Sequence, residues 1–208
     1  MNSLSSYLHD SLRSAWSSGF GDQARRAAIV APLLALCGFV SFWLFPDLSE
    51  KLLASLTQAI ESVGIAQAEG MDAAALLFAN NLSAAFSALL WGLVPFAYLA
   101  AFPLGFNFFI LGTMGAYYVQ SGIGFGVFLA GILPHGIFEL PALVLFCAAG
   151  LHLCSRMTAR LRGNTDIRII QTLAESAVLL LYVILPLLAA AALVETFVTP
   201  KLLALLLG

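Results

Sequence analysis

One carboxylate stands alone in the longest uncharged part of this chain. Between Asp72 and Arg156 lie 83 residues, and Glu139 alone among them carries a formal charge. It belongs to the motif Pro134-His135-Gly136-Ile137-Phe138-Glu139-Leu140-Pro141, in which His135 precedes it by four residues. On a helix this spacing places both side chains on one face. A histidine beside a carboxylate can hold or pass a proton, contact a substrate, or fix one helix to another.

The chemistry of this pair is limited by the cost of a charge at membrane depth. An ionised carboxylate in lipid must be neutralised, paired or hydrated, and His135 is the nearest partner in the sequence. We favour a structural interpretation, in which the pair fixes a bent helix to its neighbours. A proton relay or a substrate contact is the next interpretation, and it stays open at this point.

A metal site is the weakest interpretation of the same motif. Zinc hydrolases need three protein ligands and a general base, and neither His9 nor His152 is spaced to join His135. An intramembrane serine hydrolase would need a nucleophile motif that the sequence does not show. We therefore expect no metal, no cofactor and no catalytic residue.

Three amides and two acids are the remaining polar candidates. Asn80, Asn81 and Asn107 lie in the same apolar run, and amides in membranes usually hydrogen-bond across helices. Glu175 begins the last apolar segment and Glu195 ends it, and we expect water to solvate both. The candidate functional residues are therefore the motif residues Pro134, His135, Gly136, Glu139 and Pro141, with Asn80, Asn81, Asn107 and Glu195 in support.

The composition defines the class of protein that must position these residues. Of the 208 residues, 61% are hydrophobic and 10% are charged, with a mean hydropathy of +0.97, whereas soluble domains carry about 25% charged residues. The length provides one membrane domain, residues 1–208, and no separate soluble domain. A net charge of −2 gives no indication of nucleic-acid binding. The sequence predicts an all-α, polytopic transmembrane bundle with membrane lipids as its first partners.

Five spans follow from length and charge. A crossing needs about 20 apolar residues, which residues 27–45 and 176–194 supply at the two ends. Basic residues collect on the cytoplasmic side, and here they cluster before the first span and in a loop at 155–171. The run between these clusters must then cross three times, near 74–94, 96–119 and 123–154. The N-terminus is expected inside and the C-terminus outside.

The fourth span is expected to be broken. Residues 123–154 are too many for one straight crossing, and Pro134 and Pro141 each remove a backbone donor. We expect a broken or re-entrant element that is enclosed by protein or faces a wet cavity.

Two kinds of residue pattern occur outside the motif: a leucine periodicity in the segments outside the spans and stripes of small residues within the spans. Leucines recur every fourth residue in the cytoplasmic segment 1–26 and in the non-cytoplasmic loop 46–72, which predicts an amphipathic helix in each. Small residues form stripes at Ala84, Ala88 and Gly92 and at Gly112 and Ala116. Such stripes allow close helix approach, either within one bundle or in a homo-oligomer.

The stretch Leu133–Ala142 resembles the signature of the stage II sporulation protein M family of bacterial membrane proteins. The supporting matches are Asn80-Asn81, Gly92, Asn107 with Ile110-Leu111-Gly112, and Val194–Pro200. The resemblance covers residues 78–200, and it departs from the family at Asn107-Phe108, where the family has Asn-Gly. It implies a five-span, multi-pass protein of the bacterial cytoplasmic (inner) membrane. The sporulation member is described as a scaffold that recruits and localises cell-wall hydrolases.

Two functions are expected from these observations. The first is a non-enzymatic membrane scaffold that organises envelope or cell-wall-remodelling partners, with a homo-oligomer left open. The alternative is a transporter, permease or lipid-handling protein that uses the His135/Glu139 pair, because transporters build their sites on interrupted helices near the membrane midplane.

Overall fold

The computed structural model describes residues 2–62 and 68–207, and these residues form helices and connecting turns without a strand. Five stretches are long and apolar enough to cross a membrane: His9–Leu44, Gly70–Gly92, Ala101–Gln120, Phe125–Leu161 and Ile169–Leu207. The predicted all-α bundle with five spans is therefore confirmed. Helices dominate because lipid offers no partners for backbone groups, so each span must satisfy its own.

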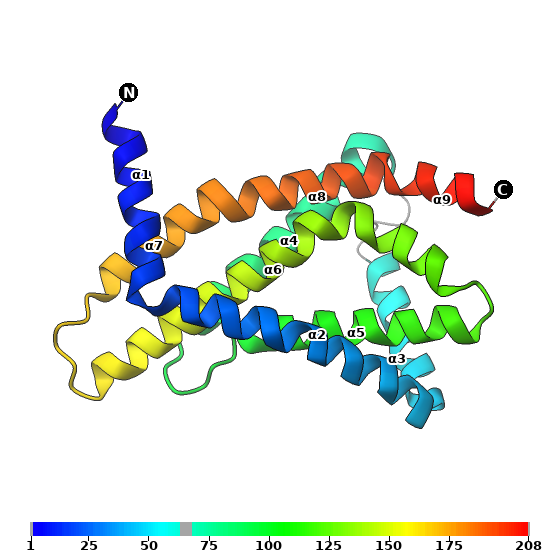
Figure 1. Cartoon of the computed structure of the whole chain (residues 1–208), viewed down its shortest axis with the longest axis horizontal. Helices are drawn as coiled ribbons and strands as arrows, with labels where there is room; N and C mark the ends of the chain where they lie inside the picture. The colour runs from blue at the N-terminus through cyan, green and yellow to red at the C-terminus, as the bar shows by residue number, and fades with distance from the viewer. Residues whose placement is uncertain (1, 63–67, 208) are drawn as a thin grey trace.

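Several of these stretches contain more than one element, as Figure 1 shows. Two short segments, η1 and η3, connect longer α-helices: η3 is π-helical and continues α7 into α8, whereas η1 contains a kink at Gly19 (φ 110°) between α1 and α2. The elements in chain order are α1 (Asn2–Ala15), η1 (Trp16–Phe20), α2 (Gly21–Leu44), α3 (Pro46–Ser62), α4 (Gly70–Gly92), α5 (Ala101–Gln120), α6 (Phe125–Leu161), α7 (Ile169–Leu179), η3 (Leu180–Ile184), α8 (Leu185–Phe197) and α9 (Thr199–Leu207).

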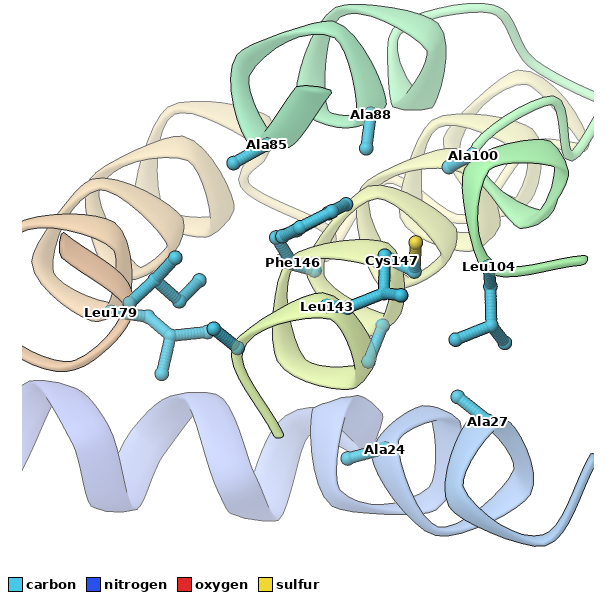
Figure 2. Packing of buried hydrophobic residues seen from close by; sticks show 14 of the residues in the cluster. Ala24, Ala27, Ala85, Ala88, Ala100, Leu104, Leu143, Phe146, Cys147 and Leu179 are labelled. Carbon is cyan, nitrogen blue, oxygen red and sulfur yellow. The ribbon is translucent and has the colours of Figure 1, made fainter. Parts of the chain in front are cut away.

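The helix that carries the candidate motif, α6, is the centre of the bundle. It is the most deeply buried of the five spans, and it packs against α2, α4, α5 and α8. Figure 2 shows side chains of α6, including Phe146 and Cys147, surrounded by small residues such as Ala27 of α2 and Ala85 of α4. The outer faces of the bundle instead expose large apolar side chains such as Ile29, as expected for a surface that lipid covers.

The small-residue stripes form close contacts between helices inside the bundle. A Cβ atom at Gly112 of α5 would overlap the backbone carbonyl of Ala35 in α2, and one at Gly38 would overlap that of Phe109. A Cβ at Gly92 of α4 would likewise come 2.5 Å from the carbonyl oxygen of Gly150 in α6. The stripes therefore set the spacing between helices of one chain, and they are not free for contacts between copies.

The break predicted in the fourth span is not found. α6 continues as one helix from Phe125 to Leu161, and both Pro134 and Pro141 lie inside it. Figure 1 shows that the helix bends in its first half instead of ending. A proline removes a single N–H, and membrane helices tolerate this because the other backbone bonds persist and neighbouring helices support the bend.

The two helices predicted outside the spans are present as α1 and α3. Figure 1 shows the N-terminus and the turn at 162–168 at one end of the bundle, and the C-terminus and the turn at 121–124 at the other. The end with the N-terminus carries Arg160 and Arg162, and the opposite end carries Lys51. By the distribution of charges, the first end is predicted to face the cytoplasm.

This orientation is testable with single cysteines in a background that lacks the native ones. Ser121 lies in the turn between α5 and α6, and Asn164 lies in the loop between α6 and α7. Both residues are exposed, so each is replaced by cysteine in turn. We expect a membrane-impermeant maleimide to label Ser121→Cys in intact cells, and to label Asn164→Cys after permeabilisation. Labelling in the opposite order would show that the orientation is reversed.

Candidate functional site

His135 and Glu139 lie on the same face of α6, as their spacing in the sequence predicts. Nε2 of His135 lies 3.9 Å from Oε2 of Glu139, and their side chains are 11% and 28% exposed. This distance exceeds that of a hydrogen bond. The two side chains therefore face each other across a gap, and the direct hydrogen bond that the spacing predicts is not formed.

The other ring nitrogen of His135 has a partner of its own. Its Nδ1 lies 3.3 Å from Oγ1 of Thr199, and that hydroxyl donates to the carbonyl of Val194 at 3.3 Å. While it donates to Val194, the Thr199 hydroxyl can accept from Nδ1–H of His135. In the neutral tautomer with that hydrogen, Nε2 carries the lone pair that faces Glu139.

A second carboxylate completes the group. The potential ligand atoms of His135, Glu139 and Glu195 all lie within 4.8 Å of one another. Glu195 is half-buried, and its solvation by water stays a prediction. It lies near the end of α8, and Thr199 begins α9; both helices pack against α6. Local sequence gives no signal for this contact, because Glu139 and Glu195 are 56 positions apart.

These three side chains line a cavity of about 310 Å³ between α4, α5, α6 and α8. Asn80, Asn81 and Asn107 also line it, as does Gly136. Asn81 of α4 faces Glu139 of α6 across this cavity, and its Oδ1 accepts from Nδ2 of Asn80 at 3.4 Å. The interhelical bond expected for Asn81 stays a prediction. Asn107 instead donates to the carbonyl of Pro103 in its own helix at 2.8 Å, so the prediction of an interhelical bond is wrong there. Every supporting amide nevertheless reaches the same cavity.

A larger cavity of about 860 Å³ adjoins the first one. Asn80, Asn107, Ile110 and Met114 line both, so the two cavities are neighbours along α4 and α5. The larger cavity is further bounded by polar side chains from α3 and the last turns of α5, namely Glu50, Thr57, Tyr117 and Tyr118. Polar side chains therefore extend from the site towards the end of the bundle where α3 lies.

The two prolines of the motif lie away from the polar cavity. Neither Pro134 nor Pro141 lines the polar cavity. Pro141 borders a separate apolar groove of about 510 Å³ together with Trp16, Ala31 and Val144. The prolines therefore shape the helix that carries the site, whereas His135, Gly136 and Glu139 face the polar space.

Glu175, the other acid in the last span, is held quite differently. It is buried, and its Oε1 accepts from Ser14 at 2.6 Å and from Gln171 at 3.0 Å. The prediction that water solvates this acid is also wrong. Its hydrogen bonds tie α1 to α7, so Glu175 has donors for its charge and provides a contrast to the Glu139 and Glu195 pair.

Fold and site together define a polytopic helical membrane protein with an ionisable group of three side chains at a polar cavity. The chain matches the stage II sporulation protein M family over residues 27–200. It belongs to that family, as the motif at Leu133–Ala142 indicates. Comparison with curated proteins and with solved structures found no significant match.

Proposed function

We propose that this protein is a non-enzymatic scaffold of the bacterial cytoplasmic membrane, which organises partners in the envelope or in cell-wall remodelling. The observation that supports it is a helix outside the spans at each end of the bundle. Figure 1 shows α1 projecting from one end and α3 lying across the other. Helices in this position can bind a partner on either side of the membrane without disturbing the packed spans.

The outer helix α3 has the character of a docking element. Leu52, Leu53 and Leu56 are half-buried, whereas Asp47 and Lys51 are exposed. α3 packs against α2 and α5, so the leucines hold it to the bundle and a charged face stays free. The proposed partner on this side is a protein with an extracytoplasmic domain.

Photo-crosslinking in native membranes tests the scaffold directly. A crosslinking amino acid in place of Lys51 or Ser55 is expected to give a discrete adduct with an envelope protein. The matched controls are Leu33 and Leu36 on the exposed face of α2, which are 56% and 57% exposed and are expected to crosslink to lipid. Absence of protein adducts from α3, and equally from α1 at Ser6 or Arg13, would contradict the scaffold.

A second function is favoured by the polar cavity and by the larger cavity that adjoins it beside α3. We propose as the alternative a permease or lipid-handling protein in which Glu139 contacts the transported species. In reconstituted vesicles, movement of protons, small solutes or lipids should then be lost in Glu139→Gln and kept in Glu175→Gln. Equal activity in both variants would exclude Glu139 from such a pathway.

Membrane lipids are the partners expected at the exposed apolar side chains of the spans. Because the small-residue stripes are already buried inside the bundle, a homo-oligomer would have to use one of these lipid-facing surfaces. The molar mass of the detergent-solubilised protein tests whether it forms.

A further inference from the structure

We propose that His135, Glu139 and Glu195 form a binding site for a divalent transition-metal cation of the zinc type. The proposal goes beyond the scaffold function and does not depend on it. It rests on three potential ligand atoms from two helices, α6 and α8, which converge within 4.8 Å at a polar cavity.

The ligand atoms of the three side chains can all act as acceptors towards one another. When Nδ1–H of His135 donates to Thr199, the Nε2 that lies 3.9 Å from Glu139 is an acceptor. The carboxylates of Glu139 and Glu195 are acceptors as well. Three acceptors that face one another repel unless a positive species lies between them, and a cation satisfies all three at once.

The two acids at the site have no basic side chain beside them. Two carboxylates border the cavity, and neither Lys nor Arg is among the residues that line it. The amides of Asn80, Asn81 and Asn107 line it as well, but they carry no charge. Charges removed from water must be compensated. A divalent cation would match the two carboxylates, whereas Glu175 at the other end of the same span already has two donors.

The ring nitrogen of His135 that faces away from the two acids contacts Thr199. A metal-binding histidine usually donates its other ring N–H to a neighbouring oxygen, which fixes the ring and its tautomer. His135 has this arrangement with Thr199, and Thr199 is in turn fixed by Val194. Thr199 is therefore a positioning residue for the proposed site.

The geometry is close to what a metal ion requires. In a tetrahedral site with metal–ligand bonds of about 2.0 Å, the ligand atoms lie about 3.3 Å apart. Rotation of the two flexible glutamate side chains can close the remaining difference from 4.8 Å. Imidazole and carboxylate ligands together suit Zn²⁺, Mn²⁺ or Fe²⁺ better than the all-oxygen sites of Mg²⁺ and Ca²⁺.

Access and the fourth ligand follow from the cavity. The site lies in the 310 Å³ cavity, which can hold water as a further ligand, and the larger cavity beside α3 adjoins it. Glu50 lines the larger cavity, where an acid favours the approach of a cation. The cation would therefore enter from the end of the bundle that is predicted to face away from the cytoplasm.

The test is Zn²⁺ binding to the full chain in mild detergent after treatment with a chelator. Equilibrium dialysis followed by metal analysis is expected to give one Zn²⁺ per chain, with much weaker binding of Mg²⁺. Glu139→Gln and Glu195→Gln should each weaken the affinity at least tenfold. Glu175→Gln, an equally conservative change at a buried acid of the last span, should leave the affinity unchanged.

Two further measurements keep the result independent of folding defects in the variants. Co²⁺ added to the wild-type chain should give the absorption spectrum of a low-coordinate nitrogen and oxygen site, and Zn²⁺ should displace it. Thr199→Val keeps all three ligands and should weaken Zn²⁺ binding by about 10-fold to 100-fold. Affinity that is the same in wild type, Glu139→Gln and Glu195→Gln would overturn the proposal. So would the absence of stoichiometric Zn²⁺, and the three side chains would then share protons only. Either outcome leaves the crosslinking test of the scaffold unaffected.

Discussion

Gly112→Leu is expected to prevent the chain from reaching its five-span fold. Gly112 is buried in α5, and even a Cβ atom there would overlap the backbone carbonyl of Ala35 in α2. A backbone carbonyl cannot rotate away as a side chain can, so α2 and α5 would have to separate. That separation would also break the hydrogen bond from Thr113 to the carbonyl of Gly38, at 3.3 Å. The loss should exceed about 4 kcal/mol, which is exceptional for one substitution.

The measurement is the yield of monodisperse protein from detergent extracts, followed by thermal unfolding of whatever remains soluble. Gly105→Leu is the matched control, because Gly105 lies in the same helix and a Cβ there meets nothing within 4 Å. The control should extract and unfold like the wild type. A Gly112→Leu protein with wild-type yield and unfolding temperature would show that α2 and α5 are not in this contact.

His135→Ala is expected to cause the second largest loss. The substitution removes the partner of Thr199, removes the side chain that faces Glu139, and leaves a cavity beside a buried part of α6. Loss of a buried polar contact and loss of packing each cost about 1–3 kcal/mol. We expect a total of about 3 kcal/mol, which corresponds to a fall in unfolding temperature of about 10 °C for a chain of this size.

Leu133→Ala controls for removal of a side chain from the same helix, because Leu133 is 53% exposed on the lipid-facing surface. It should lower the unfolding temperature far less. A double-mutant cycle with Thr199→Val should give a coupling of about 0.5–3 kcal/mol between the two positions. If His135→Ala unfolds at the wild-type temperature, the contacts of His135 with Thr199 and Glu139 do not contribute to stability.

The motif illustrates what local spacing can and cannot predict. The i, i+4 spacing correctly places His135 and Glu139 on one helix face, because helix geometry alone fixes that relation. It does not give their partners, which come from α8, α9 and α4. The number and spacing of histidines argue against a metal ligand set, but the third potential ligand atom belongs to Glu195, whose local surroundings resemble those of any acid at the end of a span.

The prolines show a similar limit. Their removal of backbone donors is a local property, and the bend of α6 follows from it. Whether the helix stops at such a point depends on support from packed neighbours, and α6 packs against α2, α4, α5, α7, α8 and α9. The small-residue stripes likewise indicate close approach, and the pairing of Gly112 with α2 and of Gly92 with Gly150 is visible only in the assembled bundle.

The sequence by itself determined that this chain crosses a membrane five times as helices, and it determined which helix carries an acid beside a histidine. Those properties depend on hydrophobic length, on backbone groups that lipid cannot satisfy, and on the fixed pitch of a helix. Only the tertiary structure decided that Glu195 and Thr199 meet His135 and that Glu175 is held by α1. Such contacts depend on how helices far apart in the chain pack together, and no local pattern of residues encodes that.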